Sequence, residues 1–423
     1  MSYIKKIQKA LSAFSQISDY SIREVNEQSY EMFYDIHKLE TIRTTSTLEA
    51  LVTVYTLIVE GEEKFLGSAS FTVLHSLSSK ELNELIANAL FSAKFAKSEY
   101  YELPSGNRKS VKAKLIEGDE FANLESIAKV FFGASDQLVK FNSLELFLNV
   151  KTTHLVNSKG VDYKTSNEII KVEAIPSYKD DKIATELYRM FRYDKLDLTK
   201  IREDALIAVS DVKDRASAIK LEEKKTVNVI LREDDAAELF NELIDNFDYA
   251  DVYDGSSLKQ VGENYQTNPA SPLTIKVGAN SKHEFFDIDG VIVKDTCVLK
   301  NGVLNSNYGQ NRFAYYVNAI PSGIPSKIIV KPGKRSVVEL KKEPYLEIIA
   351  LSGIQIDIYS GYIGGEIRLA KYFDGKNEIA LSGLSFSGDL NKAINEFKLS
   401  KEVVEKYGYK GPKYVLLKDM TVL

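Results

Sequence analysis

The sequence predicts an α+β protein built of two domains. The chain has 423 residues, which is more than one hydrophobic core usually organises. Helical and strand-like patterns are mixed along it rather than strictly alternating, so mixed or antiparallel sheets with flanking helices are favoured over a doubly wound parallel sheet. A hydrophobic content of 44% and a charged content of 27% are ordinary for a globular protein.

The first half begins with an amphipathic helix and continues into strands. Ser2 is suited to cap a helix that places Ile4, Ile7, Leu11 and Phe14 on one face. Branched and aromatic residues favour strands in the segments that follow, and a glycine turn joins the clearest hairpin. The expected strands cover residues 20–27, 30–39, 51–60, 64–73, 143–149, 151–157 and 163–172.

Two further helices are expected before the domain boundary. Ser78-Ser-Lys-Glu81 is typical of a capping box, and its helix is expected to run to about Lys97. Residues 177–221 form a charged helical connector. This connector fits either a helix docked along one face or a helix that contacts another subunit. Its apolar stripe consists of Ile201, Ala205, Ala208 and Val212.

The second half is strand-rich with glycine turns. The charge run Glu-Glu-Lys-Lys at residues 222–225 marks its start, so the expected domains are residues 1–221 and 222–423. Pro332-Gly333 is expected to turn the chain, and Asp389 to open a short helix. The expected strands cover residues 327–331, 346–351, 354–359, 366–373 and 378–385.

A strand at residues 227–231 and a helix at residues 235–247 carry the most informative pattern. Within the helix, Asn241-Glu242-Leu-Ile-Asp-Asn246 has the length of an H-E-x-x-x-H zinc motif, but asparagine stands where each histidine would be. Neutral imidazole binds zinc well, whereas an asparagine amide binds it poorly. We therefore interpret these positions as a degenerate site, and we assign no catalytic, metal-binding or cofactor-binding residue.

The histidines suggest no second metal site. Alternation along a strand would place His283, Asp287 and Asp289 on one face, which could in principle hold a metal. The favoured interpretation is a polar strand face or a turn entering Gly290. The four histidines are otherwise scattered, at His37, His75, His154 and His283.

Three tyrosine-rich segments are candidates for a peptide groove. They lie at residues 100–102, 313–317 and 359–362. Tyrosine offers apolar area with a polar tip, which suits peptide contact as well as ordinary packing. Packing is the favoured interpretation.

Composition narrows the class of protein. A net charge of −5 argues against a general nucleic-acid binder, which would carry a basic surface. The single cysteine, Cys297, excludes an internal disulfide framework and suits a reducing compartment. No apolar stretch approaches the roughly 20 residues of a membrane helix, and the N-terminus lacks the apolar core of a secretory signal. We expect a cytoplasmic protein with no nucleic-acid or membrane partner.

Short segments in a fixed order resemble one known family. They are Asp287-Ile-Asp-Gly290, Cys297-Val-Leu-Lys-Asn-Gly-Val-Leu304, Pro332-Gly333 with Ser336 and Glu339-Leu340, and Ala380-Leu-Ser-Gly383 with Leu390 and Ile394. Asn157-Ser-Lys-Gly-Val161 is the best match in the first half. Their order and spacing resemble the TldD/PmbA family of metallopeptidases, in which PmbA is also called TldE. The chain is similar to PmbA-like members, which lack the zinc motif.

That resemblance implies two kinds of subunit. TldD-like chains carry H-E-x-x-x-H and a later cysteine that bind zinc, with the glutamate as general base. PmbA-like chains share the fold without this site and pair with a TldD-like chain. The pair is a cytoplasmic protease that degrades unfolded or flexible peptides and matures some peptide antibiotics, and older descriptions call the family modulators of DNA gyrase. Because Asn241 and Asn246 replace both histidines and the C-terminal tail has no cysteine, zinc is expected only in a partner.

Three functions remain open at this level. The favoured one is a non-catalytic PmbA-like subunit, which would hold unfolded peptide beside the zinc of a TldD-like catalytic subunit. The second is a stand-alone homodimer of the same fold that binds peptides or another ligand. The third is a metallopeptidase with an atypical metal site. The chain is thus not expected to be catalytic by itself.

Overall fold

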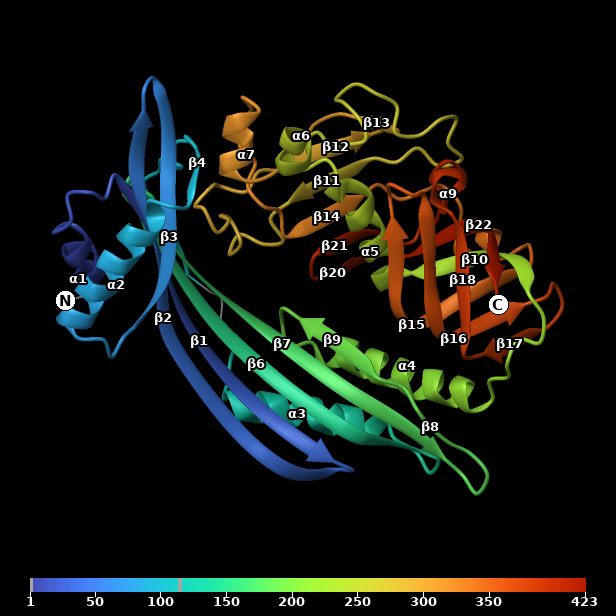
Figure 1. Cartoon of the computed structure of the whole chain (residues 1–423). Coiled ribbons are helices and arrows are strands. Elements are labelled where there is room, and N and C mark those ends of the chain that lie inside the picture. The colour runs from blue at the N-terminus through green and yellow to red at the C-terminus, as the bar shows by residue number, and fades with distance from the viewer. Residues whose placement is uncertain (1–2, 113–115) are drawn as a thin grey trace.

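The structure is a computed structural model that describes residues 3–112 and 116–423. One long curved sheet dominates its first half, and its second half is a more compact body inside the curve of that sheet (Figure 1). Helices flank sheets that are antiparallel or mixed. The predicted α+β class is confirmed.

The N-terminal sheet has nine strands in the order β4-β3-β2-β1-β6-β7-β5, with β8 and β9 added to β7. The hairpin expected at residues 51–60 and 64–73 is confirmed as the antiparallel pair of β2 and β3. The strands are β1 (Asp19–Asp35), β2 (Lys38–Glu60), β3 (Glu63–Leu74), β4 (Lys97–Glu99), β5 (Arg108–Val111), β6 (Val139–Asn157), β7 (Asp162–Lys179), β8 (Ala184–Glu186) and β9 (Arg189–Tyr193).

Two of the strand breaks expected in this half are wrong. The segments at residues 20–27 and 30–39 belong largely to one uninterrupted strand, β1, and residues 143–157 all lie in β6. The chain instead turns at Ile36 and His37, which have φ angles of 38° and 69°. Residues other than glycine rarely adopt this left-handed backbone conformation. Because neither residue is glycine, the sequence contains no ordinary turn signal at this point.

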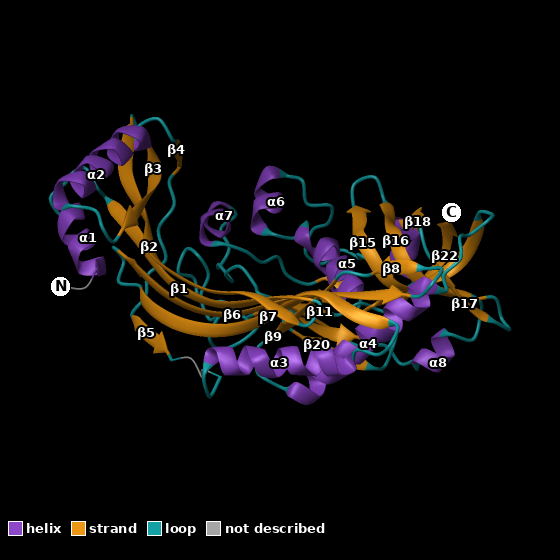
Figure 2. Cartoon of the chain, turned by 90° about the horizontal axis from the view of Figure 1, so that it is seen from below, coloured by secondary structure: helices purple, strands orange, loops and turns teal. Residues whose placement is uncertain are grey.

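Four helices pack on the N-terminal sheet: α1 (Tyr3–Leu11), α2 (Ser79–Ala93), α3 (Glu120–Ala134) and α4 (Leu198–Ala216). The first two cover one end of the sheet and the other two lie along its remainder (Figure 2). The predicted capping box at Ser78 and Glu81 is confirmed. The helix ends at Ala93 rather than near Lys97, because Lys97 begins β4. Sequence reasoning missed α3.

The helical connector expected at residues 177–221 is wrong in its extent, because residues 184–186 and 189–193 form strands β8 and β9 that pair with β7 and only α4 is helical. Helix α4 joins the two halves of the molecule. Its expected stripe of Ile201, Ala205, Ala208 and Val212 is buried. The stripe lies in a core cluster that also contains Ile349, Ala350 and Leu369 from the C-terminal half. The docked interpretation of this stripe is therefore confirmed, while the domain boundary near residue 222 stays a prediction.

The C-terminal half contains a seven-stranded and a six-stranded sheet. The first consists of β10 (Lys225–Arg232), β15 (Tyr345–Asp357), β16 (Tyr362–Phe373), β17 (Glu378–Leu381), β18 (Leu384–Asp389), β19 (Lys398–Leu399) and β22 (Tyr414–Val422). The second consists of β11 (Ile275–Gly278), β12 (Thr296–Lys300), β13 (Val303–Leu304), β14 (Lys327–Val330), β20 (Val403–Lys406) and β21 (Tyr409–Pro412).

The seven-stranded sheet closes on itself. Strand β10 pairs with β15 in parallel and with β22 in antiparallel orientation, and β15, β16, β18 and β22 pair in sequence, so five strands form a closed ring. Closure leaves no free edge within the ring. The helices of this half are α5 (Glu233–Asp245), α6 (Tyr249–Asp254), α7 (Asn311–Tyr316), α8 (Val337–Leu340) and α9 (Leu390–Glu396).

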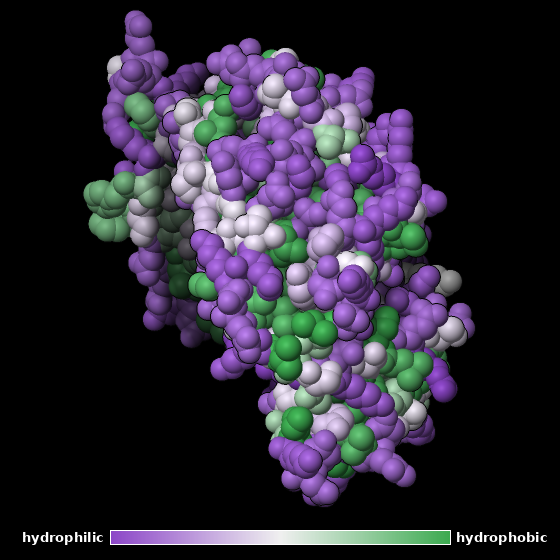
Figure 3. Space-filling view, turned by 90° about the vertical axis from the view of Figure 1, so that its right-hand side faces the viewer, coloured by the Kyte–Doolittle hydropathy of each residue, from purple (hydrophilic) through white to green (hydrophobic). Residues whose placement is uncertain are grey.

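The outer surface of the C-terminal half is mixed in character. Figure 3 shows hydrophobic residues in small groups among hydrophilic ones on this face, as is normal for a protein surface. Within the part of the chain that the structure describes, no helix combines the length and apolarity needed to cross a membrane.

Candidate degenerate metal site

Helix α5 carries the degenerate motif and is anchored in the core between the two C-terminal sheets. Its buried face, Ala236, Leu239, Phe240, Leu243 and Ile244, belongs to a cluster that includes side chains of both sheets. The helix begins at Glu233 rather than at Asp235, because three acidic residues in its first turn suit the positive end of the helix dipole. It ends at Asp245, which leaves Asn246 as the C-cap residue rather than an internal one.

The two asparagines of the motif lie in different environments. Asn241 and Glu242 are exposed on the helix surface. Asn246 is only 3% exposed. The structure therefore does not bring the two amides together as a pair of ligands facing one point.

The amide of Asn246 is fully occupied by structural hydrogen bonds. Its Nδ2 donates to the carbonyl oxygen of Ser256 at 3.0 Å and to the hydroxyl of Tyr359 at 2.9 Å. Its Oδ1 accepts from the backbone N–H of Leu258 at 2.6 Å. The residue thus ties the end of α5 to the loop after α6 and to the turn between β15 and β16. Asparagine has two amide donors and a carbonyl acceptor, and all of these are used.

An acidic pocket of about 210 Å³ lies beside these residues. Burial and the carboxylate of Asp245 raise the pKa of Glu242, and burial and Asp251 raise the pKa of Asp245. Such a concentration of carboxylates favours a cationic group, for example an ammonium. The pocket is lined by Glu242, Asp245, Asn246, Asp251, Ile356, Asp357, Ile358 and Tyr359.

Sequence reasoning missed half of the eight residues around this pocket. Asp251 lies in α6, whereas Ile356, Asp357 and Ile358 lie at or just after the end of β15, more than a hundred residues beyond α5. The one signal in the sequence was the tyrosine-rich segment at residues 359–362, which was a candidate for a peptide groove. Asp357 is held by local hydrogen bonds with Ser360, which lower its pKa.

The residues at the motif do not fit a zinc ion of the kind that the family resemblance implies. Of the three motif positions only Glu242 has an anionic oxygen, and the amide oxygen of Asn246 already accepts from Leu258. Across residues 3–112 and 116–423, no group of three or more His, Cys, Asp or Glu side chains is placed to hold a metal.

The second metal candidate is a turn. Residues 281–290 form turns and a single bridge rather than a strand, so the expected strand face of His283, Asp287 and Asp289 is wrong. The carboxylate of Asp287 accepts from the backbone N–H groups of Asp289 and Val291 at 3.0 and 2.9 Å. This geometry supports Gly290, whose φ angle is +92°. The polar turn entering Gly290 is confirmed.

Two of the three tyrosine segments form a contact between the halves of the molecule. Tyr100 and Tyr101 pack edge-on against Tyr315 and Tyr316, with ring centroids 6.3 and 6.0 Å apart. The hydroxyl of Tyr316 donates to the carbonyl oxygen of Glu99 at 2.7 Å. These segments therefore have a packing role, which confirms the favoured interpretation for them.

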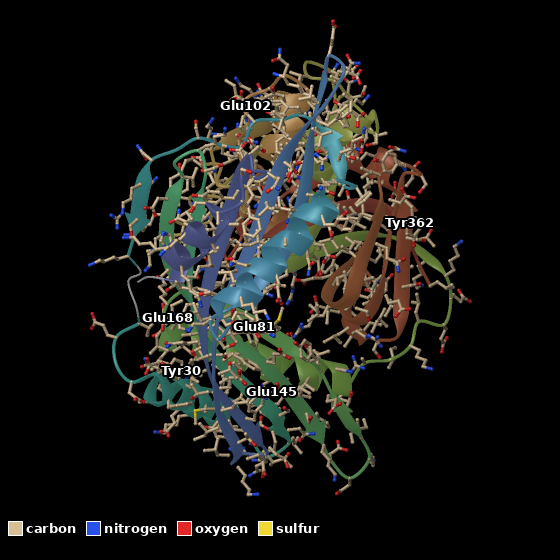
Figure 4. All side chains as sticks on the ribbon, turned by 60° about the vertical axis from the view of Figure 1, so that its left-hand side comes forward. Tyr30, Glu81, Glu102, Glu145, Glu168 and Tyr362 are labelled. Atoms are coloured by element: carbon tan, nitrogen blue, oxygen red, sulfur yellow. The ribbon has the colours of Figure 1, made fainter. Side chains whose placement is uncertain are left out.

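The third tyrosine segment lies apart from the other two. Figure 4 shows Tyr362 on the strands of the C-terminal half, well away from Glu102. Within this segment, Tyr359 lines the acidic pocket. Its hydroxyl also accepts the hydrogen bond from Asn246. Of the three tyrosine segments, only this one contributes to the acidic pocket.

The first turn of α5 contains a carboxyl group that should make stability depend on pH. Burial, together with Asp234 and Glu238, raises the pKa of Asp235 to about 7. An unfolded aspartate titrates near ~3.9, so the folded state binds more protons between these values and stability falls as pH rises through that window. Asp235→Asn mimics the protonated form. We expect it to stabilise the protein by up to about 4 kcal/mol near pH 8 and to have little effect near pH 4.

Thermal unfolding of both proteins at the two pH values measures this difference. Asp254→Asn is the matched control, because Asp254 is an exposed aspartate at the end of α6. Surface substitutions of that kind change stability by less than about 0.5 kcal/mol. A stabilisation by Asp235→Asn of equal size at both pH values would contradict the assignment.

Comparison with known proteins finds a family model for the C-terminal half of the chain and several structures with the same fold. Residues 224–423 match the family model of the PmbA/TldA metallopeptidase C-terminal domain. No curated protein sequence matches the chain. Solved structures share the fold over nearly their whole length.

Three of these solved structures are similar at low sequence identity. A proposed modulator of DNA gyrase from Thermotoga maritima is 13% identical, with 100% of each chain covered and a TM-score of 0.79. TldE from Thermococcus kodakarensis is 15% identical, with 99% of each chain covered and a TM-score of 0.78. A proposed modulator of DNA gyrase from Bacteroides thetaiotaomicron is 15% identical over 99% of this chain and 97% of that one, with a TM-score of 0.77. Residues 224–423 thus match the C-terminal domain of the PmbA/TldA metallopeptidases, and the chain as a whole shares the fold of these three solved structures.

Proposed function

We propose that the chain is a non-catalytic subunit of a two-component metallopeptidase that acts on unfolded or flexible peptides. The observation that carries the proposal is the state of Asn246. Its amide stands at a position where a catalytic member has a zinc ligand, and it is committed to three structural hydrogen bonds. A residue used in this way stabilises the scaffold and is not free to bind a metal.

The remaining motif residue supports the same proposal. Glu242 is exposed beside the acidic pocket. A glutamate at this position acts as a general base when a metal lowers the pKa of a bound water, and the described residues place no group of metal ligands beside it. The contribution of the chain would then be to hold substrate, while a partner subunit supplies the zinc.

A sheet edge gives a route for binding peptide without sequence preference. Strand β20 ends the six-stranded sheet and, among the described residues, pairs with β21 alone. An extended peptide can add to such an edge through backbone hydrogen bonds, which need no particular side chains. This mode suits unfolded substrates. The net charge of −5 offers no electrostatic support for DNA as the ligand.

Reconstitution with a catalytic family member tests the proposal. The partner is a chain from the same genome that carries an intact H-E-x-x-x-H. We expect a mixture of the two chains to cleave an unfolded peptide at least about tenfold faster than either chain alone. A fluorogenic peptide assay measures the rate. The matched control replaces the motif glutamate of the catalytic partner by glutamine, which should abolish the activity of the mixture.

Two results would support the alternative functions instead. If the chain binds no such partner, or if the partner is equally active without it, the stand-alone binding protein is favoured. Metal analysis of protein purified without chelator or histidine tag tests the third function, a metallopeptidase with an atypical metal site. Stoichiometric zinc would support that function. We expect zinc well below one atom per chain.

A further inference from the structure

Strand β5 lies at one margin of the N-terminal sheet (Figure 2). Among the described residues it pairs with β7 alone, in parallel, from Arg108 opposite Asp162 to Val111 opposite Thr165. Residues 108–110 are exposed. The outer side of β5 is therefore a free edge that another strand could join.

The register with β7 decides which backbone groups of β5 are free. The carbonyl oxygen of Asn107 accepts from the backbone N–H of Asp162, so the backbone groups of odd-numbered residues point toward β7. Successive residues of a strand point their N–H and C=O groups to opposite sides. Those of Arg108 and Ser110 consequently point outward, and within residues 3–112 and 116–423 no backbone hydrogen bond uses them. Each of the two residues thus presents one donor and one acceptor to an added strand.

The free edge is also basic. Residues 103–112 contain no acidic residue and three basic ones, Arg108, Lys109 and Lys112. Alternation along the strands places Arg108 on the same face of the sheet as Lys164 of β7, which is exposed. The chain as a whole has a net charge of −5, so this margin of the sheet differs in sign from the protein around it.

Little of this positive charge is neutralised within the chain. Nε of Arg108 lies 3.8 Å from Oδ2 of Asp162, and the arginine side chain remains 85% exposed. Nζ of Lys109 lies over the ring of Phe285, 4.2 Å from its centroid. Across the described part of the chain, no ion pair involves the lysines of this margin, namely Lys109, Lys112 and Lys164.

The combination of free backbone groups and positive charge selects the kind of strand that can bind. Basic residues on an edge usually prevent strand addition, because the added strand would bury their charge. That protection acts against neutral and basic strands. An acidic strand instead places carboxylates beside these cations while its backbone pairs with Arg108 and Ser110. A nucleic acid would use the charges but not the outward N–H and C=O groups, so both features together favour a peptide.

We propose that residues 108–111 of β5 are a docking edge for an acidic, extended segment of another protein, which adds to the N-terminal sheet as a further strand. The backbone of Arg108 and Ser110 supplies the hydrogen bonds, and the basic side chains supply the selectivity. Docking at this edge requires neither a catalytic partner nor cleavage. It also lies on a different sheet from β20, so it goes beyond the proposed function and either can fail without the other.

Binding of a short labelled peptide in which valine and glutamate alternate tests the docking edge. By fluorescence anisotropy at low salt, the full chain should bind it at least about tenfold more tightly than a peptide in which valine and lysine alternate. Ser110→Pro should weaken binding of the acidic peptide at least about tenfold, because it removes an outward N–H and leaves the pairing with β7 in place. Ser110→Ala is the matched control and should bind as the native chain does.

Charge reversal provides a second readout that does not depend on the proline variant. Arg108→Glu combined with Lys112→Glu should invert the preference, so that the lysine peptide binds more tightly than the glutamate peptide. Lys80→Glu combined with Lys129→Glu is the control of equal net charge. These two lysines are 88% and 79% exposed on α2 and α3, and their reversal should leave the preference unchanged.

Three results would overturn the proposal. The first is a native chain that does not prefer the acidic peptide, and the second is a preference that both charge reversals change equally. The third is a Ser110→Pro chain that binds the acidic peptide as tightly as the native chain does. If single-stranded DNA then bound equally well to both of these chains, the basic margin would be assigned to nucleic acid instead.

Discussion

Replacing Glu347 by alanine is expected to lower the free energy of unfolding by about 3–5 kcal/mol, the usual cost of breaking a buried ion pair. Glu347 lies on β15 and is 2% exposed. Its Oε1 accepts from Nε of Arg232 at 2.9 Å, and its Oε2 accepts from Nζ of Lys341. Removal of the carboxylate leaves both cations without their anion in a largely water-excluded site. Thermal and urea unfolding of the two proteins measure the change.

The ion pairs of Glu347 should also make the stability of the protein depend on pH. Burial alone would raise the pKa of Glu347, but Arg232 and Lys341 outweigh burial and hold it below its usual value. A depressed pKa contributes stability that is present above the unfolded value of about 4.3 and is lost as pH falls through the folded value. The native protein should therefore lose more stability on acidification than Glu347→Ala does.

Glu366 provides the control for this experiment. It lies on the neighbouring strand β16, and its side chain is 75% exposed. Exposed ion pairs contribute at most about 1 kcal/mol, so Glu366→Ala should leave stability almost unchanged at every pH. If Glu347→Ala were no more destabilising than Glu366→Ala, the network around Glu347 would not stabilise the fold.

The sequence predicted the fold where its residues follow a simple period. The apolar stripe of α4, the hairpin of β2 and β3 and the capping box at Ser78 were all visible, because burial or a turn imposes that spacing locally. The turn between β1 and β2 was not, since Ile36 and His37 adopt left-handed angles without glycine. Those angles are imposed by the pairing of two long strands, and such a constraint has no local sequence signal.

The closed ring in the C-terminal half shows a second limit of prediction. Strand β10 is the first strand of this half, and its partners β15 and β22 lie at residues 345–357 and 414–422. Local patterns indicate that each segment is a strand. They do not predict which strands pair across so many intervening residues, because the pairing depends on how the whole core packs.

At the candidate site, the sequence predicted that zinc ligands are missing. It did not predict the structural role of the residues that stand in their place. Two asparagines in place of histidines argue against zinc from chemistry alone. Only the structure shows that Asn241 is exposed whereas Asn246 holds Ser256, Leu258 and Tyr359. These partners are distant in the sequence by up to 113 residues. A hydrogen bond between segments that meet only in the folded chain leaves no periodic pattern to read.

Asn246→Ala is expected to destabilise the protein by about 1–3 kcal/mol, because it removes the three hydrogen bonds of an amide that is itself buried. The carbonyl of Ser256 loses the donor at 3.0 Å, and the N–H of Leu258 loses the acceptor at 2.6 Å. A fully buried group left unpaired costs about 1–3 kcal/mol, and the cost is smaller here because Leu258 is 45% exposed and water can replace the lost acceptor. Thermal unfolding measures the loss, and faster hydrogen exchange at Leu258 would locate it.

Asn241→Ala is the matched control, since Asn241 is exposed on the same helix and its replacement should change stability by less than about 0.5 kcal/mol. A large difference between the two variants would mean that the second motif position is retained for structure. Equal and small effects would mean that the amide of Asn246 is dispensable, and the position would then be open to another role. Asn246→His sharpens the choice: an imidazole cannot reproduce two amide donors and a carbonyl acceptor. We therefore expect this variant to lose stability as well, without gaining zinc, because its single new ligand has no partner at Asn241.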